Sequence, residues 1–128
     1  HALSWPDRLP SRMDALDLTT AHPLSFETPD EGRFPALGLA RQALRDGGEM
    51  PAVLNAANEV AVASFLDGRC ALPSITASVK ATLDRWSDRN APLTDFEQVR
   101  AVDLDARKVA RQELRKYVGA GIGSEIRC

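Results

Sequence analysis

The chain has 128 residues, a common length for one compact domain, and 44% of them are hydrophobic, as in an ordinary globular core. Its 16 basic and 18 acidic residues give a net charge of −2, which argues against a broad electrostatic surface for nucleic acid or an anionic membrane. The two cysteines lack metal-ligand spacing and no apolar run approaches the roughly 20 residues that span a bilayer, so we expect a soluble protein of the reducing cytoplasm.

Residues 1–35 are rich in proline, which excludes a long helix there. Apolar residues in this segment alternate, Leu16 with Leu18 and Leu24 with Phe26, as expected of a ribbon laid along a surface. We predict an extended Pro-rich strap over residues 1–35 that packs on something outside this chain. Because the chain begins with His1, inside a motif that looks interrupted, we interpret it as a fragment whose upstream part is missing.

Three helical patterns follow the strap. The first begins at Pro35 and ends at Gly47, with its inward stripe predicted at Leu37, Ala40, Ala43 and Leu44. The second runs from Pro51 to Gly68. The third follows Pro73, and its apolar residues recur at helical spacing, at Ile75, Val79, Leu83 and Trp86.

Two capping signals lie in the last third of the chain. Thr94 or Asp95 can cap a short helix through Val102, and Asp103 can cap a final helix. The inward positions predicted for that helix are Ala106, Val109, Ala110, Leu114 and Tyr117. We therefore predict an all-α fold, a small helical bundle of four main helices plus a short one over residues 36–118, preceded by the strap and followed by a flexible tail over residues 119–128.

The second helix carries three polar residues in an otherwise apolar sequence. Asn55, Asn58 and Glu59 stand at i, i+3 and i+4, so they share one stripe of the helix, and we call them the polar trio. A helix that is apolar on its other faces is typical of the middle of a bundle, so we predict that the trio is buried. Buried polar groups need partners, and the most plausible one is the backbone of a crossing segment. We expect a structural role, because one carboxylate and two amides are few ligands for a hard cation.

Two other features invite a functional interpretation. The glycine-rich residues 119–123 follow a helix, whereas a phosphate loop follows a strand and opens a helix, so a frayed tail is the better account. The last helix is basic on its outer side, opposed only by Glu113, and we interpret this as a solvated face that complements the helix dipole. The basic residues are Arg107, Lys108, Arg111, Arg115 and Lys116.

Two stretches carry a family resemblance, PDEGRFPAL at residues 29–37 and PAVLNAANEVAV at residues 51–62. With the opening residues 1–8, they resemble the C-terminal region of 1-deoxy-D-xylulose 5-phosphate reductoisomerase, from the first residue to about Tyr117. The resemblance implies a homodimeric parent enzyme that forms 2-C-methyl-D-erythritol 4-phosphate on the non-mevalonate route to isoprenoids, by a metal-assisted rearrangement and hydride transfer from NADPH.

The resemblance also implies where the chemistry lies. In that family the dinucleotide-binding domain, the acidic ligands of the Mn, Mg or Co ion and the residues that hold the phosphate are upstream. No catalytic, metal-binding or cofactor-binding residue is therefore carried onto this chain. Its expected partners are the upstream catalytic and dinucleotide-binding domains of the same polypeptide, which it would brace. The alternative is a free-standing helical protein-interaction module, which the strap disfavours because its apolar residues need another surface.

Overall fold

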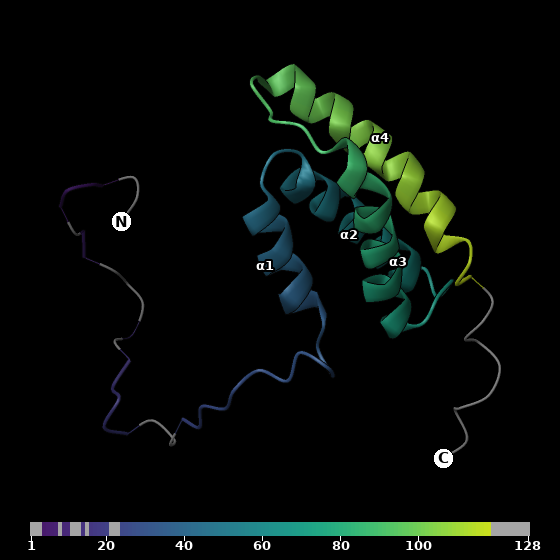
Figure 1. The fold of residues 1–128 in the computed structure, drawn as a ribbon. Helices are drawn as coiled ribbons and strands as arrows, with labels where there is room; N and C mark the ends of the chain where they lie inside the picture. Colours follow the sequence, from purple (N-terminus) through teal and green to yellow (C-terminus); the bar gives the residue numbers. More distant parts are fainter. Residues whose placement is uncertain (1–3, 8, 11–13, 15, 21–23, 119–128) are drawn as a thin grey trace, which may run out of the picture.

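The computed structural model describes residues 4–7, 9–10, 14, 16–20 and 24–118. Four α-helices follow one another, α1 (Ala36–Asp46), α2 (Met50–Leu66), α3 (Leu72–Trp86) and α4 (Phe96–Leu114), with a short 3-10 helix, η1 (Ser87–Arg89), after α3. These residues contain no strand, so the predicted all-α bundle is confirmed. Helix α2 packs on α1, α3 and α4, and α4 lies across α2 and α3 (Figure 1).

The core forms where α2, α3 and α4 meet. Val53, Ala56 and Ala57 of α2 are buried against Val79, Leu83 and Trp86 of α3 and against small residues of α4. Alanines on α2 and α4 allow the two helices to approach closely, because interaxial distance depends on the side chains at the contact. The predicted stripe of α3 is confirmed, with three of its four residues buried and Ile75 half-buried.

Helix α1 differs from its predicted orientation. Of its four predicted inward residues only Ala43 is buried, whereas Leu37 and Leu44 are exposed. Leu39 instead packs on the core, one turn before Ala43. The prediction was wrong because α1 packs mainly on one neighbour, α2, so it buries a narrow stripe and leaves its remaining leucines outside.

Helix α4 replaces two predicted helices. Asp95 caps it as expected, its carboxylate accepting a hydrogen bond from the Gln98 amide at 2.8 Å. The chain continues as helix through Asp103, which was predicted to start a new one. Asp103 pairs with Arg107 one turn later and so stabilises the interior of a single long helix. The only short helix in the described part is η1.

A polar junction fastens the start of α2 to the end of α3. The Asn90 side-chain oxygen accepts a hydrogen bond from the Glu49 amide at 2.9 Å, and the indole N–H of Trp86 donates to the Glu49 carboxylate at 2.5 Å. The Arg89 guanidinium lies over the Trp86 ring, 3.4 Å from its centroid. Gly48 allows the start of α2 to approach the loop after η1, because a Cβ at this position would lie 2.5 Å from the Ala91 carbonyl oxygen.

The segment before α1 leads away from the bundle (Figure 1). Its described residues form turns and coil without helix or strand, and its large apolar side chains are exposed. That it is a strap laid on another surface stays a prediction. The predicted tail over residues 119–128 lies outside the described residues. None of the helices in the part of the chain that the structure describes is long and apolar enough to cross a membrane.

Candidate functional site

The polar trio lies on the outside of α2. Asn55, Asn58 and Glu59 are all exposed, so the prediction that they are buried was wrong. Helix α2 is central, but its three neighbours cover its other faces and leave one face open. Leu66, farther along the stripe of the trio, is also exposed. The apolar residues on that stripe made the helix look enclosed, although Val62 is only half-buried and Leu66 is exposed.

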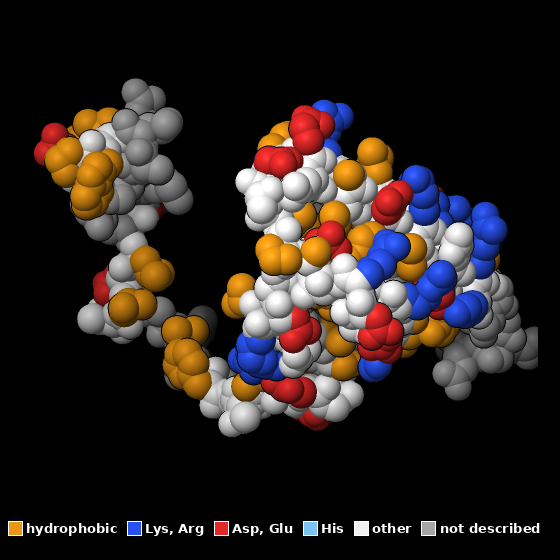
Figure 2. All heavy atoms as spheres, turned by 45° about the horizontal axis from the view of Figure 1, so that its top comes forward, with side chains coloured by type: hydrophobic (Ala, Val, Ile, Leu, Met, Phe, Trp, Pro, Cys, Tyr) orange, Lys and Arg blue, Asp and Glu red, His pale blue; other side chains and the backbone are white. Residues whose placement is uncertain are grey.

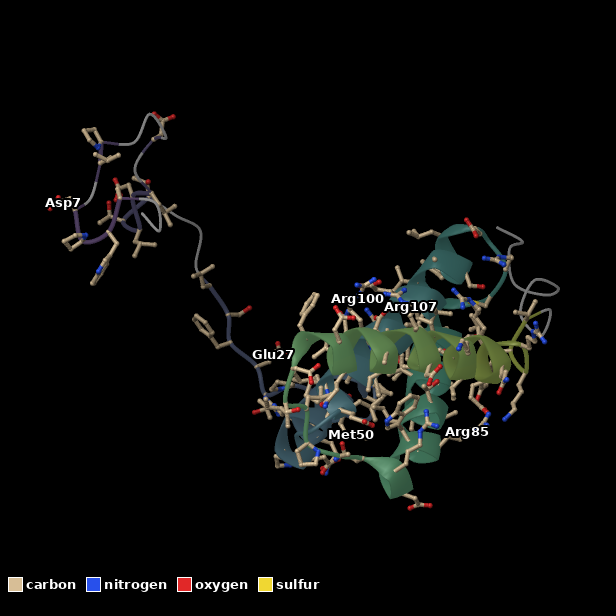
Figure 3. All side chains as sticks on the ribbon, turned by 90° about the horizontal axis from the view of Figure 1, so that it is seen from above. Asp7, Glu27, Met50, Arg85, Arg100 and Arg107 are labelled. Carbon is tan, nitrogen blue, oxygen red and sulfur yellow. The ribbon has the colours of Figure 1, made fainter. Side chains whose placement is uncertain are left out.

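Glu59 fastens α2 to α4 through a guanidinium group. Arg107 Nη2 donates to Glu59 Oε2 at 2.6 Å, while Arg107 Nε donates to Asp103 Oδ2 at 2.7 Å. The other Glu59 oxygen accepts from Asn55 Nδ2 at 3.0 Å. The interhelical partner of Glu59 is therefore a side chain of α4 and not the expected backbone of a crossing segment. Figure 3 shows Arg107 on the opposite side of α4 from Arg85.

The electrostatics of this network follow from its hydrogen bonds. Those from Arg107 and then Asn55 lower the pKa of Glu59, so this carboxyl group is ionised at neutral pH. The bonds to Asp103 and then Glu59 raise the pKa of Arg107. Arg107 thus carries a fixed positive charge between two carboxylates. The arrangement is suited to holding two helices together and not to transferring protons, because a general acid or base needs a pKa near the working pH.

Asn58 takes no part in this network. Its side chain lies at the edge of a hollow of about 210 Å³ between α1, α2 and α3, among Leu39, Leu54 and Ile75. Within the described residues, its amide has no hydrogen-bond partner. An exposed amide beside an apolar hollow is a feature of a surface that can receive another segment.

A second polar contact was missed by the sequence analysis. Glu113, predicted on the outer side of α4, is only 3% exposed. Arg85 Nη1 of α3 donates to its carboxylate at 2.9 Å, and Lys116 also pairs with it. The hydrogen bonds from Lys116 and then Arg85 lower the pKa of Glu113. A carboxylate among the alanines and leucine of the inward stripe gave no clear signal, because its partner Arg85 is 28 positions away.

The acidic and thiol side chains of the described residues are not arranged as a metal centre. No group of three or more His, Cys, Asp or Glu side chains there is placed to hold a metal ion. Glu59, Asp103 and Glu113 all accept hydrogen bonds from arginine. This part of the molecule is a helical bundle with interhelical ion pairs and an uncovered apolar segment beside it.

The uncovered apolar side chains lie before α1. Leu16, Leu18, Leu24 and Phe26 are between 71% and 89% exposed. Figure 2 shows hydrophobic side chains along this segment, set apart from the mixed charges of the bundle. Several large apolar side chains exposed along one segment indicate a contact surface, because leaving them in water costs free energy.

Comparison with known proteins gives a consistent result. A family model described as the DXP reductoisomerase C-terminal domain matches residues 1–109. The 1-deoxy-D-xylulose 5-phosphate reductoisomerase of Pseudomonas putida is 45% identical over 117 residues, which cover 91% of this chain and 29% of that protein. The protein of the same name from Acinetobacter baumannii is 45% identical over 120 residues, 94% of this chain and 29% of the relative.

Solved structures match a similar share of this chain. The reductoisomerase from Zymomonas mobilis in complex with NADPH matches with a TM-score of 0.81 at 42% identity, over 89% of this chain and 30% of that one. A DOX-P reductoisomerase in complex with magnesium matches with a TM-score of 0.80 at 35% identity, over 91% and 31% of the two chains. This chain spans about three tenths of the length of the proteins that it matches.

Proposed function

This chain belongs to the 1-deoxy-D-xylulose 5-phosphate reductoisomerase family, whose C-terminal domain model it matches, and we propose that it braces the catalytic domain of such an enzyme. The whole enzyme would convert 1-deoxy-D-xylulose 5-phosphate to 2-C-methyl-D-erythritol 4-phosphate, with NADPH and a divalent cation (Mn, Mg or Co). It would work as a homodimer in the cytoplasm. The NADPH and magnesium in the names of similar structures support the two cofactors.

The chemistry belongs upstream of this chain in our proposal. None of its residues is assigned a catalytic, metal-binding or cofactor-binding role. The pairing of Glu59, Asp103 and Glu113 with arginine supports this assignment, because a carboxylate held by arginine is a poor base and a poor metal ligand. The isolated chain is expected to leave NADPH unoxidised when it is mixed with 1-deoxy-D-xylulose 5-phosphate and magnesium or manganese. Oxidation above a no-protein control would contradict the assignment.

The exposed apolar residues of the strap are the observation that carries the bracing role. Leu24 and Phe26 are 73% and 89% exposed, so they contribute almost nothing to the bundle. Burying such a side chain stabilises a contact by roughly 1.5–3 kcal/mol. The catalytic domain just upstream in the same polypeptide is the nearest surface that can cover them. The open face of α2, with Asn58 beside its apolar hollow, provides a second contact region.

Co-expression of two separate chains tests the proposal. One chain is the upstream portion, ending before His1, and the other is this chain carrying an affinity tag. We expect them to co-purify and to restore NADPH-dependent activity. A double variant, Leu24→Ser with Phe26→Ser, should reduce co-purification at least about tenfold, since each ~1.4 kcal/mol lost is a factor of ten. Leu104→Ser is the matched control, because Leu104 is an exposed leucine on α4.

The outcomes separate the two candidate roles. If the upstream portion is stable and fully active alone and does not bind this chain, the bracing role is wrong. The free-standing interaction module then becomes the better interpretation. If the double variant and the Leu104→Ser control bind equally well, the strap does not make the contact.

A further inference from the structure

A pocket of about 410 Å³ lies between α2, the loop after it and the C-terminal half of α4. Four arginines line it, Arg69 from the loop and Arg107, Arg111 and Arg115 from α4, and we call it the arginine pocket. Its volume lies within the range of roughly 300–1,000 Å³ typical of small-molecule sites. We propose that the arginine pocket binds a phosphate-bearing small anion.

The charge balance of the pocket supports an anionic ligand. Arg69 pairs with Asp67 at 2.7 Å, and Arg107 pairs with Glu59 and Asp103. Arg111 and Arg115 have no carboxylate within ion-pair distance among the described residues. Two guanidinium groups of this hollow are therefore without an ion-pair partner in the described part of the chain, and the four arginines exceed the three carboxylates by one positive charge. A phosphate group carries up to two negative charges at neutral pH and accepts bidentate hydrogen bonds from guanidinium groups.

The helix dipole does not account for this arrangement. Positive side chains in the last turn of a helix are favoured, which explains Arg111 and Arg115 taken alone. It does not explain why Arg69, from a different element, and Arg107, about two turns before the end of α4, line the same hollow. Convergence of guanidinium groups from separate elements is the geometry that recognises an anion from several sides.

The remaining lining completes the pocket. Val60, Ala63 and Leu114 provide an apolar wall, and Ser64, itself buried, lies among them. Apolar walls lower the local dielectric and strengthen the attraction between an arginine and an anion. Among the described residues, Glu59 is the one carboxylate that lines the pocket, and it accepts hydrogen bonds from Arg107 and Asn55. Its negative charge repels an anionic ligand, so removing this charge should raise the affinity for the anion, whereas removing an arginine should lower it.

Isothermal titration of inorganic pyrophosphate tests the proposal in the full-length polypeptide that contains this domain. The double variant Arg111→Gln with Arg115→Gln should weaken one class of binding site at least about tenfold. Arg100→Gln is the control for charge on the same helix outside the pocket; it removes one positive charge, whereas the double variant removes two. Any phosphate site upstream is the same in every variant, so the difference between variants reports on this pocket.

A second variant keeps the result decisive. Glu59→Gln should tighten pyrophosphate binding about threefold, since it removes a nearby negative charge. If the double variant fails to fold, this increase alone decides, and unchanged or weaker binding contradicts the proposal. Equal losses in the double variant and in Arg100→Gln would indicate general electrostatics and also refute it. One further result would refute the proposal: the unchanged protein does not bind pyrophosphate, and the double variant has a lower Tm while Arg100→Gln does not. The two arginines would then pair with carboxylates of the upstream domains, which fill the pocket.

Discussion

Replacing Gly48 with alanine adds a single methyl group, yet it should lower the free energy of unfolding of the bundle considerably. An alanine there would have to adopt a φ of +54°, which costs an L-residue about 1–2 kcal/mol. Its Cβ would also lie 2.5 Å from the Ala91 carbonyl oxygen and 2.6 Å from the Asn90 side-chain oxygen, so the loop after η1 must move. That movement breaks the hydrogen bond from the Glu49 amide, worth about 0.5–1.5 kcal/mol.

The expected loss for Gly48→Ala is therefore about 1.5–3.5 kcal/mol in the free energy of unfolding. Gly68→Ala is the matched control, because Gly68 has a φ of +70° and nothing within 4 Å of an added Cβ. It should lose only about 1–2 kcal/mol. Urea unfolding followed by circular dichroism measures both, with the slope m unchanged. If the two variants lost equal stability, the close approach at Gly48 would not constrain the loop and our reasoning would be refuted.

Three other outcomes are expected. Asn58→Leu should change the free energy of unfolding, measured with urea, by less than about 0.5 kcal/mol, because Asn58 is exposed in this chain. The surface control Lys80→Ala should change it equally little, and a loss above about 1 kcal/mol in Asn58→Leu would restore the buried interpretation. Lowering the pH below 4.5, the ordinary pKa of a glutamate side chain, should destabilise the bundle, because the pKa of Glu113 is lower in the folded state and its stabilising charge is lost on protonation. Glu113→Gln should weaken this dependence of stability on pH. Arg85→Met should lower the midpoint more than Arg100→Met, since only Arg85 contacts the buried Glu113.

The sequence was a good guide to the helices that have a strong apolar period. The stripe from Ile75 to Trp86 is confirmed because a helix that packs on two neighbours must bury residues at helical spacing. The start of α1 after Pro35 and the end of α2 before Gly68 also follow from local chemistry. Asp103 misled the prediction, since the same side chain can cap a helix or pair with an arginine inside one.

The candidate site was predicted less well. Helix α2 is central as expected, and of the predicted trio only Asn55 and Glu59 are joined by a hydrogen bond. Their burial was wrong, and the partner of Glu59 was missed, because Arg107 lies 48 positions away in the chain. A helical period tells which residues share a face, but not whether another element covers that face.

The sequence by itself determined the family and the all-α class, since both depend on motifs and periods that are local in the chain. Tertiary structure alone decided which faces stay open, which carboxylates are buried and where the arginines converge. The physical reason is that these properties belong to pairs of elements, and their free energies depend on distances between residues that are far apart in sequence. For Asn58 and the strap, the deciding neighbour is proposed to be a surface upstream of His1.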